Sequence, residues 1–204
     1  PLRGQNNVQG ACDMGALPNV YPGYQSVADL NIREKFEKAW GTDLCNSTGL
    51  VLTEVIDAAY RGDIQAMYLV GENPVLSDPD ARHVEEALRN LKYFIVQDIF
   101  LTETAQLADV VLPATSFAEK DGTYTNTERR VQLAQRAIQP RGDSWPDWWI
   151  TCQIAKRLGG QGFEFENPSQ IMEEITYLTP SYGGISYARL EEGGLQWPCP
   201  TEDH

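Results

Sequence analysis

Short apolar runs alternate with longer stretches of helical periodicity in the middle of the chain. The apolar runs lie at 66–70, 93–97 and 109–113, and an amphipathic helical pattern at 81–92 separates the first two. Thr102 can cap a shorter helical segment before the third run. Short apolar runs bounded by turn residues are typical of strands in a parallel sheet. The pattern therefore predicts a βαβαβ unit with right-handed crossovers and strands buried on both faces.

Helical periodicity also surrounds this unit. Asp29 can cap the first flanking helix and Gly41 can end it, whereas Gly62 can end the second. An Asp121-Gly122 turn precedes a segment in which apolar and polar residues alternate, as in a half-buried strand. The predicted helices cover 29–40, 50–60, 147–158 and 168–177, and the predicted β segment covers 131–138.

These elements predict an α/β fold with an open, mainly parallel sheet and helices on both faces, in the manner of a Rossmann fold. The two ends of the chain are rich in Gly, Pro and polar residues, and we expect both to be irregular. The expected organisation is a loop segment at 1–27, an α/β domain at 28–178 and an irregular tail at 179–204.

Charge narrows the choice of partners. The 204 residues include 16 Lys and Arg against 29 Asp and Glu, which gives a formal net charge of −13. Nucleic acids and membrane surfaces are bound through basic faces, so we expect neither as a partner. An anionic ligand would depend on backbone N–H groups and a few local arginines. No apolar run approaches the ~18 residues of a membrane span and no signal peptide is recognisable, so we expect no direct membrane insertion.

The cysteines show no metal-site spacing. Cys12, Cys45, Cys152 and Cys199 are far apart and form no C-x-x-C pair, so we expect no zinc or iron–sulfur site within this chain. Scattered thiols suit a reducing compartment and favour a cytoplasmic location, with the periplasm as the alternative. We expect Cys12 to be a buried structural thiol.

Common fingerprints of nucleotide binding and hydrolysis are also missing from the sequence. It contains neither a G-x-G-x-x-G run after a strand nor a G-x-x-x-x-G-K-[ST] loop. His83 lies in the amphipathic pattern at 81–92, where a helix-surface role is the more common one. His204 is the last residue, so the two histidines do not indicate a catalytic triad.

The loops after the three predicted strands are the candidates for a binding site. They read GENPVLSD at 71–78, QDIFLT at 97–102 and LPATS at 112–116, and all carry small or hydrogen-bonding groups. Ligands of open parallel sheets bind at the carboxyl ends of the strands, and these loops suit a phosphate-bearing or nucleotide-like ligand. The ordinary polarity of surface loops explains the same residues equally well.

Asp147, in the stretch DSWPDWW, has two interpretations of its own. As the first residue of a helix, its carboxylate would interact favourably with the helix dipole. As a site residue, the carboxylate could accept two parallel hydrogen bonds from the N–H edge of a guanine. The residues alone favour the helix-end interpretation.

Several long stretches resemble a known family. They are RGQNNVQGACDMGALPNVYPGY, YLVGENPVLSDPD, FIVQDIFLTETAQLADVVLPATSFAEKDGTYTNTERR and GGLQWPCP. In order and spacing they resemble the molybdopterin oxidoreductases, and within these the catalytic (alpha) subunits of formate dehydrogenases. The resemblance covers essentially the whole chain, and the choice of formate dehydrogenase depends mainly on RGQNNVQGACDMG.

The resemblance implies that the chain is an internal part of a much larger subunit that oxidises formate to carbon dioxide. Such subunits bind molybdenum or tungsten through two molybdopterin guanine dinucleotides and pass two electrons to a 4Fe–4S cluster. The cysteine or selenocysteine ligand of the metal and the cluster-binding cysteines would lie outside this chain, which alone should be inactive. The implied partners are formate, the other domains of the subunit, and iron–sulfur or hydrogenase-type electron-transfer subunits.

The resemblance also assigns individual residues. Arg3 corresponds to the arginine that orients the formate carboxylate, and a planar guanidinium that stays charged suits this role. Gly4 and Gln5 would follow it at the edge of the cofactor, and no residue of the chain, Cys12 included, is expected to bind the metal. The resemblance implies contacts with one guanine dinucleotide for the remaining residues, which are Gly71, Glu72, Asn73, Ser77, Gln97, Ala114, Thr115 and Asp147. Of these, Ala114 would contribute only its backbone.

The resemblance favours the interpretation in which Asp147 binds guanine. Two alternatives for the function of the chain stay open. The first is another member of the superfamily, such as a nitrate reductase. The second is a subunit that keeps the fold without the cofactor and acts as a scaffold in a respiratory complex. The retention of Gln97, Asp147 and the GENP run argues against a scaffold, which would not need them.

Overall fold

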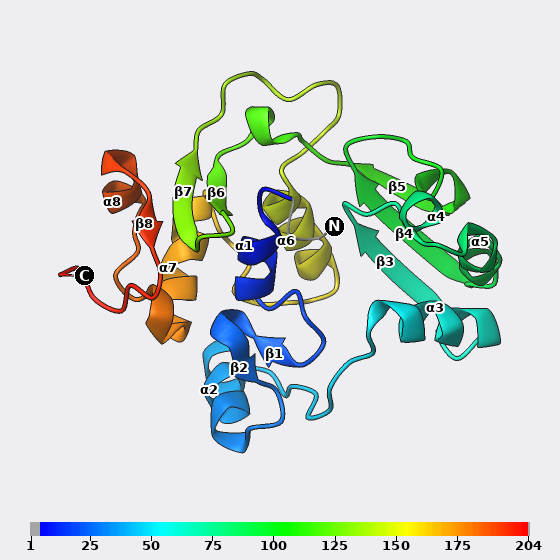
Figure 1. Cartoon of the computed structure of the whole chain (residues 1–204), viewed down its shortest axis with the longest axis horizontal. Coiled ribbons are helices and arrows are strands. Elements are labelled where there is room, and N and C mark those ends of the chain that lie inside the picture. Colours follow the sequence, from blue (N-terminus) through cyan, green and yellow to red (C-terminus); the bar gives the residue numbers. More distant parts are fainter. Residues whose placement is uncertain (1–4, 204) are drawn as a thin grey trace. The chain divides into compact units, whose positions relative to one another are not determined.

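The chain forms two structural units, which are drawn in the computed structural model of Figure 1. The structure describes residues 5–203. Unit 1 combines the chain up to Gly49 with Lys120–Ala137 and everything from Thr151, and unit 2 combines Leu50–Glu119 with Ile138–Ile150. This division differs from the expected segments at 1–27, 28–178 and 179–204, because residues 28–49, 120–137 and 151–178 group with the two ends of the chain.

Unit 2 contains the parallel sheet that the apolar runs predict. Its three strands have the order β3-β4-β5, and both pairings are parallel. Val70 is in register with Gln97, and Gln97 with Leu112, so the three strands end at one edge. The elements of unit 2 are α3 (Leu52–Arg61), β3 (Ala66–Val70), α4 (Pro74–Ser77), α5 (Ala81–Arg89), β4 (Tyr93–Asp98), η3 (Ala105–Leu107), β5 (Val110–Pro113), η4 (Phe117–Glu119) and the beginning of α6 (Asp147–Arg157).

Helices α3 and α5 cover one face of this sheet. Ile56 and Ala59 of α3 and Leu88 of α5 pack with Phe94 and Val96 of β4, and all five are almost completely buried. This spacing of apolar residues on the helices and the alternation on the strand are what the sequence pattern requires. The mixed α/β class and the parallel sheet are therefore confirmed.

The expectation that every strand is buried on both faces is wrong for β3. Its residues alternate between exposed and half-buried, and Tyr68 and Val70 keep 40% and 49% of their surface exposed. Tyr93 of β4 lies on the same face of the sheet as Tyr68 and is 48% exposed. The reason is that β3 is an edge strand and that α3 and α5 pack on the opposite face.

The helix in the crossover between β4 and β5 is shorter than predicted. Thr102 does accept a hydrogen bond at its side-chain oxygen from the backbone N–H of Ala105, at 3.1 Å, as a capping residue should. The segment then forms only the three-residue 3-10 helix η3. Thr104, the residue before η3, is fully buried, and its hydroxyl donates a hydrogen bond to Asn73. This contact with another loop holds the start of the segment in its position.

Unit 1 is built around a small antiparallel sheet with the order β6-β7-β8. Val131 of β7, Met172, Tyr182, Leu190 and Cys199 form its buried core. Besides the remainder of α6, its elements are α1 (Val8–Asp13), β1 (Val20–Tyr21), η2 (Pro22–Tyr24), β2 (Gln25–Ser26), α2 (Leu30–Trp40), β6 (Gly122–Thr125), β7 (Arg130–Ala134), α7 (Pro168–Leu178), η5 (Pro180–Tyr182), α8 (Tyr187–Glu192) and β8 (Leu195–Gln196).

The predicted helix boundaries that depend on capping residues are confirmed. The carboxylate of Asp29 accepts hydrogen bonds from the backbone N–H groups of Asn31 and Ile32 at the start of α2. Gly41 and Gly62 end α2 and α3 with φ angles of 65° and 80°, in the left-handed region that favours glycine.

The two ends of the chain contain more regular structure than predicted. Helix α1 and two short strands lie within 1–27, and η5, α8 and β8 lie within 179–204. Tyr182, Leu190 and Cys199 of the second segment are buried, so this segment is part of the core of unit 1. Composition alone missed this because the apolar residues that hold the segment are few and widely spaced.

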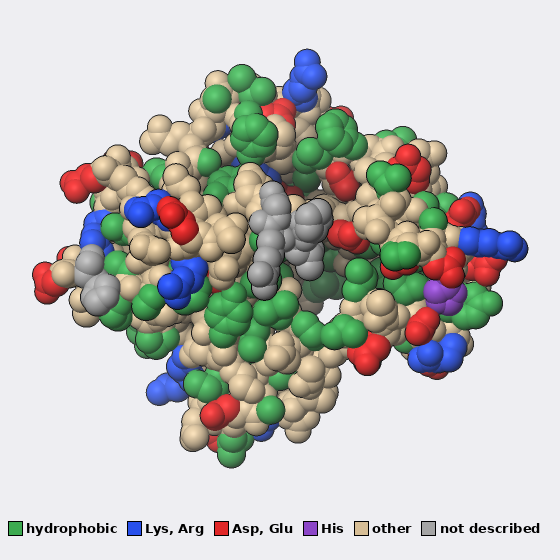
Figure 2. All heavy atoms as spheres, in the orientation of Figure 1, with side chains coloured by type: hydrophobic (Ala, Val, Ile, Leu, Met, Phe, Trp, Pro, Cys, Tyr) green, Lys and Arg blue, Asp and Glu red, His purple; other side chains and the backbone are tan. Residues whose placement is uncertain are grey.

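The surface agrees with the mixed charge of the sequence. Figure 2 shows acidic and basic side chains close together on the face that it draws. None of the helices in the described part of the chain combines the length and the apolar character needed to span a membrane.

Candidate functional site

Gln97 is the central polar side chain at the carboxyl edge of the parallel sheet. It is the fifth residue of β4 and only 1% exposed. Its amide nitrogen donates a hydrogen bond to Oδ1 of Asp147 at 2.7 Å, and its amide oxygen accepts one from the hydroxyl of Tyr68. A buried amide with both ends bonded has a fixed orientation.

Asp147 reaches this edge through a β-type contact far along the sequence. The backbone N–H of Trp145 donates to the carbonyl of Pro113 at 3.1 Å, and the N–H of Thr115 donates to the carbonyl of Trp145 at 3.1 Å. These bonds make an isolated parallel bridge between Ala114 and Trp145, which extends the sheet beyond β5. Asp147 follows two residues later as the first residue of α6, so its predicted position at a helix end is confirmed.

Two indole rings lie beside this carboxylate in the sequence and stack on one another. The ring centroids of Trp145 and Trp149 are 4.2 Å apart and the planes differ by 17°. Trp145 is 49% exposed. A half-exposed indole two residues from a carboxylate in the sequence is a combination that suits a planar base with N–H groups on its edge.

The GENP loop after β3 is held by its own polar groups. Gly71 has a φ of 64°, and its N–H donates to the carbonyl of Gln97 at 2.8 Å, so the loop turns away at the end of the strand. The hydroxyl of Ser77 donates to the carboxylate of Glu72 at 3.0 Å, across the short helix α4. Gly71, Glu72 and Ser77 are therefore brought together by the loop itself.

Asn73 joins this loop to the next one. Its amide nitrogen donates to the carboxylate of Glu103 at 2.9 Å, which lowers the pKa of that carboxyl group. Its amide oxygen accepts a hydrogen bond of 2.6 Å from the hydroxyl of the buried Thr104. Both ends of the Asn73 amide are thus engaged within unit 2, and its visible role is to fix the loops after β3 and β4 to one another.

The remaining predicted residues fall into three groups. Ala114 and Thr115 follow β5 and are 6% and 0% exposed, so the start of the loop after this strand is buried. Gln5 is exposed and belongs to unit 1. Arg3 and Gly4 lie outside the described residues.

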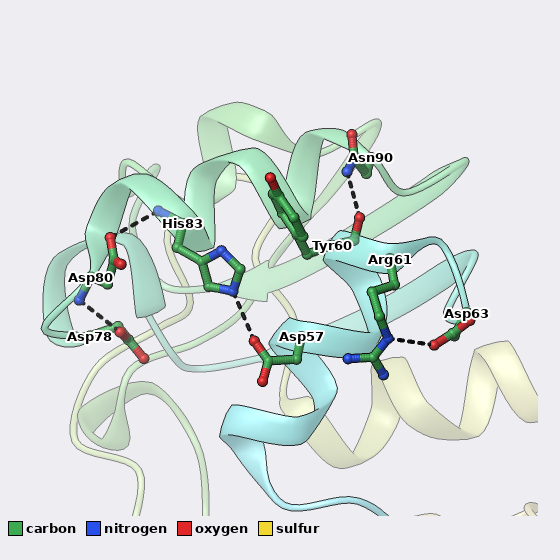
Figure 3. Close-up of polar contacts among 8 residues, drawn as sticks. All are labelled: Asp57, Tyr60, Arg61, Asp63, Asp78, Asp80, His83 and Asn90. Atoms are coloured by element: carbon green, nitrogen blue, oxygen red, sulfur yellow. Dashed lines mark hydrogen bonds and ion pairs between the residues drawn. The ribbon is translucent and has the colours of Figure 1, made fainter.

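His83 lies on the opposite side of the sheet, where α3 and α5 meet (Figure 3). Its Nε2 atom is 2.9 Å from Oδ1 of Asp57, and its ring centroid is 4.7 Å from that of Tyr60. Figure 3 shows that α3 contributes Asp57 and Tyr60 and that α5 contributes His83. The histidine therefore connects two helices at the surface, which confirms the helix-surface prediction.

The hollows of unit 1 lie elsewhere. One, of about 440 Å³, is lined by Arg136, Ser169 and Tyr187 among others, and the second, of about 820 Å³, is lined by Trp40, Phe163 and neighbouring residues. Neither is lined by a predicted site residue. Within residues 5–203 the structure contains no group of three or more His, Cys, Asp or Glu side chains placed to hold a metal ion.

Comparison with known proteins identifies the family. The family model described as "Molybdopterin oxidoreductase" matches residues 2–157, a span that includes every predicted site residue. The chain belongs to the molybdopterin oxidoreductase family. The prediction made from the sequence motifs is confirmed at this level.

Two curated relatives are close in sequence. The F420-dependent formate dehydrogenase subunit alpha of Methanocaldococcus jannaschii is 56% identical over 205 residues, which cover 100% of this chain and 30% of the relative. The F420-dependent formate dehydrogenase 2 subunit alpha of Methanococcus maripaludis is 53% identical with the same two coverages. The chain thus spans less than a third of the length of these relatives.

A solved structure supports the fold. Acetylene hydratase from Pelobacter acetylenicus superimposes with a TM-score of 0.60 over 81% of this chain and 24% of its own, at 19% sequence identity. At this identity the likeness concerns the fold alone.

Sequence reasoning missed two parts of the site. The first is Tyr68, whose hydroxyl bonds to Gln97; the even spacing from Tyr68 to Val70 and the register of Val70 with Gln97 place both side chains on one face. The second is the stacked pair Trp145 and Trp149. Both lie two residues from Asp147, and this spacing in the sequence could have indicated them. Both are recognisable once the strand pairing is known.

Proposed function

We propose that this chain is a cofactor-binding part of the catalytic subunit of a molybdenum- or tungsten-dependent formate dehydrogenase. The observation that supports this best is the hydrogen bond between Gln97 and Asp147 at the carboxyl edge of a parallel sheet. The site lies within the span that matches the molybdopterin oxidoreductase family, and the relatives named above are formate dehydrogenase alpha subunits.

The residues of unit 2 fit a guanine nucleotide. An ionised carboxylate offers about four acceptor positions, and the amide of Gln97 uses one of those of Asp147. A guanine edge presents two neighbouring N–H donors, which a carboxylate can accept in parallel. The exposed indole of Trp145 offers a surface on which the base can stack, and Gly71 lets the loop after β3 come close to a phosphate.

In this proposal the chain holds one molybdopterin guanine dinucleotide, and the cofactor with its metal supplies two-electron chemistry when bound. Arg3 holds the carboxylate of formate through its planar pair of N–H donors and keeps its positive charge throughout. Gly4 and Gln5 follow it at the edge of the cofactor. The metal ligand, the 4Fe–4S cluster and the electron-transfer partners belong to parts of the enzyme beyond this chain.

The role of Arg3 is tested in the full-length subunit. Arg3→Lys keeps the charge and removes the bidentate fork, so we expect formate turnover to fall at least 100-fold, about 3 kcal/mol in the barrier, with metal and pterin contents unchanged. Arg82→Lys, at an exposed arginine on α5, is the matched control and should leave turnover unchanged. Full turnover by Arg3→Lys, or formate oxidation by the 204-residue chain alone, would refute the proposal.

The cofactor contact is tested separately. Asp147→Asn replaces an acceptor oxygen by an amide donor, which faces the N–H edge of guanine with the wrong polarity. Loss of a charge-assisted hydrogen bond costs about 1.5–3 kcal/mol, so we expect guanine nucleotide to bind about 10- to 100-fold more weakly. Measurement of GMP released by acid from the purified full-length subunit checks this, and unchanged GMP content and affinity would contradict it.

A further inference from the structure

A chain of three side chains links the open face of the parallel sheet to the candidate guanine site. The hydroxyl of Tyr68 bonds to the amide oxygen of Gln97, and the amide nitrogen of Gln97 bonds to Oδ1 of Asp147 at 2.7 Å. Tyr68 comes from β3, Gln97 from β4 and Asp147 from the start of α6. Three separate elements of unit 2 thus meet through two consecutive hydrogen bonds.

The direction of these hydrogen bonds is fixed by chemistry. An ionised carboxylate can only accept, so the amide nitrogen of Gln97 must face Asp147 and the amide oxygen must face Tyr68. An oxygen can only accept from the phenol, so Tyr68 must donate its proton. Burial raises the pKa of the Tyr68 hydroxyl and the charge of Asp147 raises it further, which keeps this proton in place.

Sheet geometry explains why these two strand residues can meet. Tyr68 is in register with Ile95, and Ile95 and Gln97 point to the same face because they are two residues apart. The phenol spans the diagonal between neighbouring strands, a distance that an aromatic side chain can cover. Gln97 is 1% exposed, so its amide oxygen would be left without a comparable partner if the phenol were removed.

We infer that Tyr68 is a positioning residue that sets guanine selectivity through Gln97 and Asp147. The inference rests on the proposed function, since it concerns the same nucleotide site. Without the proton from Tyr68, the amide oxygen of Gln97 loses its partner, and the amide is held at one end only, through its donor bond to Asp147. The carboxylate is then held less firmly on the side of Gln97, and the two parallel acceptors that match the guanine edge are less well aligned.

Tyr68→Phe is the variant that removes the proton and keeps the ring. Tyr93→Phe is the matched control, because Tyr93 lies on the same face of the neighbouring strand and its hydroxyl makes no hydrogen bond with any residue that the structure describes. The full-length subunit, prepared without cofactor, is titrated with GDP, IDP and ADP in competition with a fluorescent GDP. IDP lacks the exocyclic amino group and so reports on recognition of that part of the base.

We expect Tyr68→Phe to weaken GDP binding about three- to tenfold, the effect of one lost hydrogen bond, and to leave IDP and ADP binding nearly unchanged. The ratio of GDP to IDP affinity falls, whereas a purely structural role would weaken all three ligands equally. Tyr93→Phe should behave as the unsubstituted subunit, and urea denaturation checks that both variants are fully folded under the conditions of the titration.

The outcomes distinguish the role of Tyr68 from the proposed function. If the unsubstituted subunit prefers GDP and Tyr68→Phe keeps the same affinity ratios, the role of Tyr68 is refuted while the proposed function stands. If Tyr68→Phe weakens all three nucleotides equally, the residue supports the fold without setting selectivity, and the inference fails. If the unsubstituted subunit shows no preference for GDP, the proposed guanine site is refuted and the inference with it.

Discussion

The buried carboxylate of Asp13 in unit 1 gives a sharp test of the hydrogen-bond energetics. Asp13 is 0% exposed and accepts two hydrogen bonds, one of 2.6 Å from the hydroxyl of Tyr182 and one of 2.7 Å from the amide of Gln9. These contacts connect α1, which follows the segment with Arg3, to the core of the unit. Burial raises the pKa of Tyr182, as does its bond to Asp13, so the hydroxyl is protonated at neutral pH.

Tyr182→Phe removes one of these donors and leaves the ring in place. A hydrogen bond to a charged group contributes about 1.5–3 kcal/mol, and a chain of about 200 residues changes its melting temperature by about 2–4 °C per kcal/mol. We therefore expect a loss of about 1.5–3 kcal/mol in unfolding free energy and a decrease of about 3–12 °C in melting temperature. Urea denaturation followed by tryptophan fluorescence measures the first, because Trp197 is 5.9 Å from the ring of Tyr182.

Two further variants make this result interpretable. Tyr177→Phe changes a tyrosine that is 85% exposed and should stay within about 0.5 kcal/mol of the unsubstituted chain. Asp13→Asn should cost less in the Tyr182→Phe background than alone, because the two groups share one hydrogen bond. Equal stabilities for Tyr182→Phe and Tyr177→Phe would show that the buried contact adds nothing to stability.

Three other predictions follow from the remaining contacts. The hydroxyl of Ser47 lowers the pKa of the exposed Cys45 and burial raises that of Cys152, so iodoacetamide should modify Cys45 first at pH 7–8, as peptide mapping can show. Burial, and then the charge of Asp121, raises the pKa of Tyr187 to about 12. The Tyr187 hydroxyl therefore ionises first in the unfolded chain, near pH 10. The free energy of unfolding falls as the pH rises from 10 to 12, and this fall should be smaller in Tyr187→Phe. His83→Ala breaks a surface contact and should cost less than about 1 kcal/mol in thermal denaturation.

The local signals of the sequence predicted most of unit 2. The apolar run at 66–70 is β3, residue for residue, and Gly62 ends α3 as expected. These features depend on neighbouring residues, so the sequence contains the information in one place. The same is true of Asp147, whose position at the start of a helix follows from the residues around it.

The parts that could not be predicted depend on distant partners. The bridge between Ala114 and Trp145 joins segments that no local pattern connects, and it is what brings Asp147 to Gln97. The exposure of Tyr68 follows from which face of the sheet the helices cover, a property of the assembled unit. Arg3 stays a prediction, since it lies outside the described residues and depends on the family resemblance.

The interrupted course of unit 2 along the chain imposes an order on its assembly. Its sheet is complete in sequence at Pro113, but Asp147 comes 50 residues after Gln97, and Lys120–Ala137 in between belongs to the other unit. A growing chain can therefore pair β3, β4 and β5 well before the carboxylate exists. During synthesis the hydrogen bond between Gln97 and Asp147 is among the last features of the sheet edge to form, so a nascent chain that ends before Trp145 has the sheet without this contact.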